Sequence, residues 1–305
     1  MPMPSLTDPA SPIGVFDSGI GGLSVLRALR AALPRERFVY LADSAHAPYG
    51  ERGDAYVASR THAIARHLRQ AHGIKALVVA CNTATAAAIH DVRGQYPELP
   101  LVGVEPALKP AVALTRTGRV GVIGTRGTLT SAKFRRLHES LQGQAEFVVQ
   151  PCDGLAYAIE CSTADTLGDA PSATKIRALC ADYTATMGRF GQEPGDIDTL
   201  VLGCTHYVFA EAELRSLIGP GVQLVETGEP VARQTRRLLD AAGLQAPDGP
   251  GAGTVRLFTT GDLAPLQAAA GRWLDLPPQA CGTVSVPMEE AACPPALPTL
   301  PALAP

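Results

Sequence analysis

Short apolar runs alternate with longer segments of helical period, and this alternation restricts the fold more than any other feature. The runs that predict strands are Ile13–Phe16, Phe38–Leu41, Ala76–Val79, Val102–Val104, Val120–Ile123, Glu146–Val149, Leu200–Leu202, Gln223–Val225 and Thr254–Phe258. Between them, apolar residues recur at helical spacing, as in 23–33. Strands separated by helices favour a parallel sheet covered by helices on both faces. The sequence therefore predicts the α/β class.

Length and charge narrow the possible partners. The chain has 305 residues, which suffices for two domains or one large one. Its net charge is −3 and it has no basic run, so it lacks the positive field that attracts nucleic acids or anionic lipids. The N-terminal stretch does not resemble a signal peptide, and no apolar run reaches the roughly 18 residues of a spanning helix. We expect a cytoplasmic protein with no nucleic-acid and no membrane partner.

Two pairs of segments resemble each other. Gly14–Gly19 is similar to Gly121–Arg126, because each is a short strand that breaks into a small polar turn. Ala76–Cys81 is similar to Thr199–Cys204, because each is a buried-type strand that ends on cysteine. Short apolar strands also resemble each other by chance, so a coincidence and an internal repeat both remain open. A true repeat would mean that two like domains face each other.

Four polar clusters follow predicted strands, where ligands bind in open α/β sheets. They are Asp17–Gly22, Ala42–Gly50, Cys81–Thr83 and Cys204–Tyr207, and we expect them to line one cleft. The glycines of the first cluster fit neither the dinucleotide fingerprint nor the P-loop. This turn either holds a carboxylate ligand at the start of a helix, or is structural with Asp17 or Ser18 as the N-cap.

Cysteine usage indicates reduced thiols. The seven cysteines form no C-x-x-C pair and no even framework. Cys81 and Cys204 are followed at once by hydrogen-bonding residues, which favours a reactive thiol over a packed one. His206 could assist Cys204 as an acid or base, although it could also be a surface histidine. The other cysteines are interpreted as small packed residues: Cys152, Cys161, Cys180, Cys281 and Cys293.

We expect no metal. His62, His67 and His72 recur every five residues, which does not hold one face of a helix, so we interpret them as exposed. Two thiols without a cofactor suit one reaction in particular. Inverting a chiral carbon requires one group that removes a proton from one side and another that delivers a proton to the opposite side. Two similar domains that each present one cysteine would supply this arrangement.

The motifs around these residues resemble those of the glutamate racemases. The matching stretches are Asp17–Leu26, Ala80–Ala84, Gly103–Ala107 and Gly203–Tyr207, in order within a similarity that runs from about residue 13 to 258. The resemblance implies a cofactor-independent isomerase that interconverts L- and D-glutamate for peptidoglycan synthesis, usually as a homodimer. It also implies two α/β domains related by pseudo-two-fold symmetry, with the active site between them.

We assign residues 13–105 and 221–286 to the first domain and 106–220 to the second, with 1–12 and 287–305 as loose extensions. By resemblance, Cys81 is the base that acts on D-glutamate and Cys204 the base that acts on L-glutamate, assisted by Asp17 and His206. The substrate-binding positions implied by the resemblance are Asp17, Ser18, Tyr49, Gly50, Asn82, Thr83, Thr205 and His206. Asn82, Thr83 and Thr205 are also candidates to stabilise the carbanion. By the same resemblance, we interpret Asp43, Ser44 and His46 as residues that shape the pocket and do not react.

Three segments depart from the pattern. Val208 and Phe209 stand where Pro-Leu is common, which should alter the packing behind Cys204 and leave its chemistry intact. Glu160 lies in a loosely matching segment, so its role as a supporting carboxylate is open, and Glu226 replaces a more usual aspartate. Two other functions remain as alternatives. One is a racemase or isomerase of another small acid, such as aspartate, a hydantoin or maleate, and the other is a glutamate-binding regulatory protein.

Overall fold

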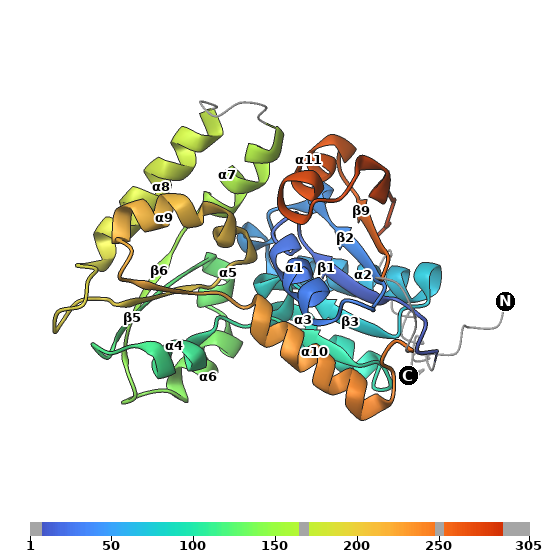
Figure 1. Cartoon of the computed structure of the whole chain (residues 1–305), viewed down its shortest axis with the longest axis horizontal. Coiled ribbons are helices and arrows are strands. Elements are labelled where there is room, and N and C mark those ends of the chain that lie inside the picture. The colour runs from blue at the N-terminus through green and yellow to red at the C-terminus, as the bar shows by residue number, and fades with distance from the viewer. Residues whose placement is uncertain (1–7, 165–170, 248–252, 289–305) are drawn as a thin grey trace, which may run out of the picture.

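The computed structural model describes residues 8–164, 171–247 and 253–288. Two parallel sheets form the centres of two lobes that lie side by side (Figure 1). The α/β prediction is confirmed, since every strand pair in the described part of the chain is parallel. Within these residues no helix is both long and apolar enough to cross a membrane.

The first part of the chain comprises β1 (Ile13–Asp17), α1 (Leu23–Ala32), β2 (Phe38–Ala42), η1 (Ser44–His46), η2 (Tyr49–Glu51), α2 (Asp54–His72), β3 (Ala76–Val79), α3 (Asn82–Gln95) and β4 (Leu101–Gly103). The middle part comprises α4 (Leu108–Leu114), β5 (Arg119–Gly124), α5 (Arg126–Leu129), α6 (Ala132–Glu139), β6 (Glu146–Pro151), α7 (Leu155–Cys161), η3 (Ser162–Ala164), α8 (Pro171–Met187), β7 (Thr199–Leu202), η4 (Thr205–Ala210), α9 (Glu211–Ile218) and β8 (Gln223–Val225). The last part comprises α10 (Gly228–Ala242), β9 (Val255–Thr259), α11 (Leu263–Leu274), η5 (Pro278–Ala280) and β10 (Cys281–Thr283).

The first sheet has the strand order β10-β9-β2-β1-β3-β4. Its central strands are buried on both sides, which explains why they read as continuous apolar runs instead of alternating ones. One face packs against α1, α10 and α11, and the other against α2 and α3. This sheet and its helices are called the first domain below.

The second sheet has the order β6-β5-β7-β8, which repeats the order β2-β1-β3-β4 of the first sheet. Its two faces are covered by α7, α8 and α9 on one side and by α4 and α6 on the other, which together form the second domain. The pairs of similar segments noted in the sequence fall on equivalent strands, β1 with β5 and β3 with β7. The two sheets therefore place Cys81 and Cys204 at equivalent positions.

One part of the domain assignment needs correction. The expected boundary at 220/221 puts β8 in the first domain, yet β8 pairs with β7, with Leu200 opposite Leu224. The chain returns to the first domain only after Val225, at the start of α10. This boundary was wrong because β8 has only three residues and its partner strand cannot be identified from such a short run. Most of the expected terminal extensions, 1–7 and 289–305, lie outside the described residues.

Candidate active site

A cleft lies between the two domains. The carboxyl ends of β1 and β3 lie on one side of it, and those of β5 and β7 lie on the other. The cleft is lined by the proposed catalytic and substrate-binding residues, whereas Asp43, Ser44 and His46 are not among its lining residues. The lining includes Asp17, Ser18, Tyr49, Gly50, Cys81, Asn82, Thr83, Cys204, Thr205 and His206. Parallel strands bring their carboxyl ends to one edge of a sheet, so residues far apart in sequence meet here. The expectation of a single cleft is confirmed.

Cys81 follows β3 directly and is the N-cap of α3, where its Sγ accepts a hydrogen bond from the Ala84 N–H at 3.5 Å. The same sulfur lies 3.7 Å from Ser18 Oγ. The side chain is 5% exposed. Burial raises the pKa of Cys81 well above its ordinary value, and the nearby Asp17 carboxylate adds to the effect. This sulfur is therefore held as a thiol in the free protein.

Asp17, at the end of β1, connects the two domains. Its Oδ1 accepts the Ser18 N–H at 2.7 Å, and its Oδ2 accepts the Gly22 N–H and, at 3.2 Å, the Thr205 hydroxyl. Burial raises the pKa of Asp17, although the charge of His206 acts in the opposite direction. A carboxyl group with a raised pKa beside a thiol can share or relay a proton at this end of the cleft.

Cys204 has different neighbours. It follows β7 and is 7% exposed, and its Sγ lies 3.8 Å from Nδ1 of His206, which η4 carries. The other ring nitrogen of His206 lies 2.7 Å from Glu160 Oε2. Burial alone lowers the pKa of His206, but hydrogen bonds to Cys204 and Glu160 outweigh it, so the pKa lies well above its ordinary value. An imidazolium beside Cys204 is the charge that stabilises a thiolate.

Glu160 was left open by the sequence, and the structure brings it into the site from α7. Its Oε2 accepts the Ile20 N–H at 2.9 Å, and its Oε1 accepts the Ser44 hydroxyl at 3.0 Å. Burial raises the pKa of Glu160, but hydrogen bonds from His206 and these two donors more than compensate, so the pKa is lowered. Glu160 and His206 therefore form a buried ion pair behind Cys204.

The glycine turn after β1 is explained by close approach of the second domain. A Cβ atom at Gly19 would collide with the Glu160 carboxylate, and one at Gly21 would collide with His206. The amide of Ile20 is taken by Glu160, so the carboxylate at this turn belongs to the protein. The N-cap of α1 is Gly22, which has no side chain, so the alternative with Asp17 or Ser18 as the N-cap is wrong; Asp17 instead accepts the Gly22 N–H.

Asn82 stands out because its side chain has no partner. It is 4% exposed, and neither its amide nitrogen nor its amide oxygen finds a hydrogen bond within the described part of the chain. Leaving a buried polar group unpaired costs about 1–3 kcal/mol. Since Asn82 faces the cleft beside Cys81, a bound molecule is the natural partner of this amide.

Three further side chains of the second domain line the cleft and were not predicted from the sequence. They are the two threonines Thr125 and Thr128 and the aromatic Tyr157. The Thr83 hydroxyl lies 3.1 Å from Thr125 Oγ1 and 3.3 Å from Thr128 Oγ1, which joins the two domains by hydroxyl groups. The signal for Thr125 was present, because it occupies in Gly121–Arg126 the place that Ser18 occupies in Gly14–Gly19.

The loop of residues 42–50 is held in place by the hydrogen bonds of Asp43. Asp43 accepts two hydrogen bonds from the buried Arg60, at 2.9 and 2.7 Å, and a third from the Tyr49 hydroxyl at 2.5 Å. Burial raises the pKa of Asp43, but these hydrogen bonds and the Arg60 charge outweigh burial and bring the pKa below its ordinary value, so the carboxylate stays ionised. Gly50 then lies against Thr125 of the second domain, where a Cβ would be 2.7 Å from the threonine Cβ.

The remaining candidates lie outside the cleft. Cys152 and Cys180 are buried, Cys161 and Cys281 are half-buried, and Cys293 lies outside the described residues. The three histidines of α2 are half-buried, so the expected exposure is wrong: His62 lies 2.7 Å from Gln95 Oε1, and His72 packs on Phe258. The described residues contain no group of three or more His, Cys, Asp or Glu placed to hold a metal.

Comparison with known proteins agrees with this geometry. Residues 13–235 match the protein family described as Asp/Glu/Hydantoin racemase. The glutamate racemase of Ectopseudomonas mendocina (strain ymp) is 48% identical over 258 residues, which cover 85% of this chain and 92% of that protein. The crystal structure of glutamate racemase isoform RacE1 from Bacillus anthracis matches with a TM-score of 0.77 and 31% identity, covering 92% of this chain and 99% of that chain.

The crystal structure of glutamate racemase from Francisella tularensis in complex with D-glutamate matches with a TM-score of 0.74 and 25% identity, over 91% of this chain and 98% of that one. These matches extend over both sheets and therefore over both sides of the cleft. The chain belongs to the Asp/Glu/Hydantoin racemase family and is an amino-acid racemase, an isomerase.

Proposed function

We propose that this racemase interconverts L- and D-glutamate by moving protons between two cysteines and the α-carbon of the substrate. One observation carries the mechanism: Cys81 and Cys204 come from opposite domains, each from the equivalent strand end, and both line one cleft. The substrate class is supported by the relatives, which are named glutamate racemases, and by the neighbour that was solved with D-glutamate.

For L-glutamate, the Cys204 thiolate takes the α-proton, the C–H bond breaks and its electron pair remains on carbon. The Cys81 thiol then donates its proton to the opposite side, which yields D-glutamate and leaves the sulfurs with exchanged proton states. D-glutamate reacts by the same steps in reverse, with Cys81 as the base. Asp17 next to Cys81 and His206 next to Cys204 support these proton exchanges.

The carbanion and the carboxylates need hydrogen-bond donors, because the α-proton is far less acidic than a thiol. The proposed donors on the Cys81 side are the unpaired Asn82 amide and the Thr83 hydroxyl. On the Cys204 side the proposed donor is the Thr205 hydroxyl, which would exchange its hydrogen bond to Asp17 for one to the substrate. Ser18, Tyr49 and the Gly50 backbone complete the proposed pocket.

We propose that pyridoxal phosphate takes no part. Pyridoxal phosphate requires a lysine for its Schiff base, whereas the described residues that line the cleft include no lysine. The two thiols can instead carry out both proton transfers themselves. By resemblance to the glutamate racemases, we further propose a cytoplasmic homodimer whose product, D-glutamate, serves peptidoglycan synthesis.

The test is to incubate the purified protein with L-glutamate in heavy water, without pyridoxal phosphate, and to follow optical rotation and the α-proton resonance. We expect the rotation to decay to zero, because the two enantiomers are equally stable, and the α-position to acquire deuterium. Parallel reactions with aspartate, a hydantoin and maleate identify the preferred substrate. Binding of glutamate without exchange would favour a regulatory protein and contradict the proposal.

A further inference from the structure

The segment that carries His206 also carries an aromatic contact between the domains. In η4, His206 and Phe209 are three residues apart, so in a 3₁₀-helix they lie on the same face. That face meets the first domain at two places: His206 lies where a Cβ of Gly21 would be, and the Phe209 ring stacks on Trp273 of α11. The ring centroids are 3.7 Å apart and the planes differ by 10°.

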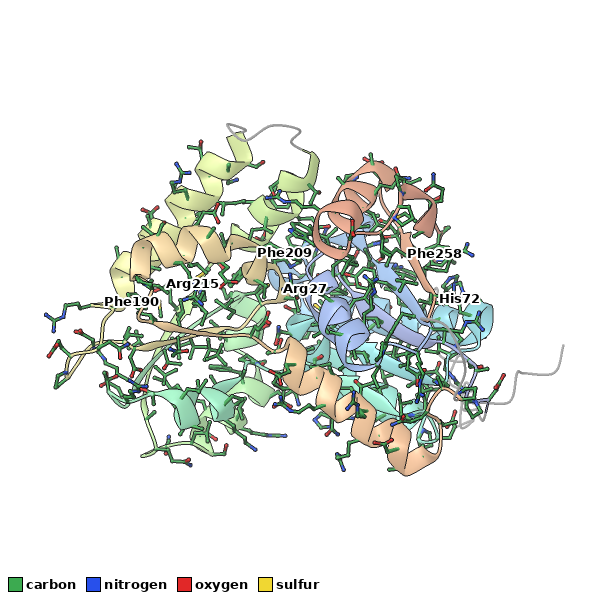
Figure 2. The ribbon with its side chains drawn as sticks, in the orientation of Figure 1. Arg27, His72, Phe190, Phe209, Arg215 and Phe258 are labelled. Atoms are coloured by element: carbon green, nitrogen blue, oxygen red, sulfur yellow. The ribbon has the colours of Figure 1, made fainter. Side chains whose placement is uncertain are left out.

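Phe209 packs against the apolar cores of both domains, a property shared by no other residue of the described clusters. Figure 2 shows it between the two lobes, whereas Phe190 lies at the far end of the second domain. The opposite face of η4 is fixed within its own domain, because the buried Tyr207 hydroxyl donates to the Cys152 carbonyl at 3.1 Å. The segment is therefore clamped from both sides.

The partner ring is held firmly. Trp273 belongs to the last turn of α11, a helix whose other side is buried in the core of the first domain. The following carbonyl, that of Leu274, accepts a hydrogen bond from the Arg30 guanidinium at 2.9 Å. The stack therefore joins η4 to a helix that is anchored in the first domain.

We propose that the Phe209–Trp273 stack is a positioning pair that holds η4, and with it the His206 imidazole, against the first domain during racemisation. The inference rests on the proposed function for its kinetic readout only. Among the described residues, His206 makes no direct hydrogen bond to a substrate-binding group of the first domain. It is connected to that domain through Glu160, which accepts a hydrogen bond from the Ile20 N–H. The stack supplies the second attachment.

Losing the stack should loosen the alignment of His206 with Cys204 and Glu160. The charged or titratable groups that face the imidazole are Cys204 on its own segment, Glu160 from α7 and Asp17 from β1. A wider separation from Cys204 and Glu160 weakens the interactions that keep the imidazole protonated. Proton transfer should slow as well, because small misplacements of a reacting group lower the turnover strongly.

The experiment compares Phe209→Leu, Trp273→Leu and Trp273→Phe with Phe190→Leu. Phe190 is the matched control, since it is half-buried against the same core of the second domain and remote from the first. We expect the two stack-breaking variants to lower kcat about tenfold with little change in KM. Trp273→Phe, which retains a stacked ring, and Phe190→Leu should stay close to the wild type.

Two further readouts do not need substrate. The chain has a single tryptophan, so its fluorescence reports directly on the loss of Phe209. The NMR resonance of the His206 imidazole can be assigned by its absence from the spectrum of His206→Asn. We expect this imidazole to titrate at lower pH in Phe209→Leu than in the wild type, and at the same pH in Phe190→Leu. If fluorescence shows a broken stack while kcat and the His206 titration stay unchanged, the positioning role is wrong. If the wild type does not racemise glutamate but the His206 titration still shifts in Phe209→Leu, the glutamate function is contradicted and the positioning role is not.

Discussion

The two cysteines occupy equivalent places in two sheets of the same strand order, yet their surroundings differ in chemistry. Cys81 lies beside a neutral hydroxyl and a carboxyl group, and its pKa is raised. Cys204 lies beside an imidazole whose pKa is raised by hydrogen bonds to Cys204 and Glu160. The repeated scaffold thus sets where the sulfurs lie, while the side chains next to them give each sulfur a different chemical surrounding.

This difference has a functional meaning for a two-base racemase. The proposed two-cysteine reaction needs one thiolate and one thiol at the same time, and two identical surroundings would favour either two thiols or two thiolates. The neighbours of the two sulfurs differ accordingly: burial and Asp17 keep Cys81 as a thiol, whereas the imidazole next to Cys204 has a raised pKa. In the proposed mechanism, this difference places the base for L-glutamate at Cys204 and the acid at Cys81.

The largest effect is expected when either sulfur is removed. Cys81→Ser and Cys204→Ser should each reduce racemisation by about 10³-fold, because a serine hydroxyl is a much weaker base than a thiolate. Cys81→Ser should still exchange the α-proton of L-glutamate in heavy water, and Cys204→Ser that of D-glutamate, as followed by proton NMR. A variant that exchanges both enantiomers equally would remove the distinction between the two sides.

A smaller effect is expected for the neighbours of the two sulfurs. His206→Asn removes a charged hydrogen bond, worth about 1.5–3 kcal/mol, and should lower kcat/KM about 10–100-fold. Ser18→Ala removes a neutral one and should lower it only about 2–10-fold. For each variant kcat/KM must be equal in both directions, since the equilibrium constant is 1. Equal losses for the two substitutions would contradict the unlike roles of these neighbours.

The smallest effect concerns pH. Glu160 raises the pKa of His206, so the imidazolium survives to higher pH than it otherwise would. Above that pKa the His206–Cys204 pair has lost the proton that the reaction needs, and activity falls. Glu160→Gln removes the carboxylate and should shift the alkaline limb of kcat/KM to lower pH by about one unit, which corresponds to ~1.4 kcal/mol. An unchanged profile would show that Glu160 does not control this proton.

The sequence predicted the site better than it predicted the boundaries. Buried parallel strands read as apolar runs and their ends as polar clusters, so Cys81, Cys204 and their immediate followers could be placed at one edge. Glu160 could not be assigned in this way, because it reaches the cleft from a helix and its hydrogen bonds to Ile20 and His206 span 140 and 46 residues. No local pattern encodes such contacts.

Two other predictions from the sequence were wrong for the same physical reason. The partner of a three-residue strand such as β8 is chosen by the surrounding helices, which the sequence does not reveal residue by residue. The histidines of α2 were expected at the surface from their spacing, but the helix packs against α3 and the sheet over more than one stripe. Both depend on tertiary packing, which overrides periodicity.

The strand order also has a consequence for the nascent chain. The second sheet is complete once Val225 has left the ribosome, whereas the first sheet still lacks β9 and β10. The second domain can therefore fold while translation continues, and β2 remains an unpaired edge until residues 255–283 emerge. A polypeptide interrupted before that point would contain both Cys81 and Cys204 and would still expose the edge of β2 that β9 covers in the complete chain.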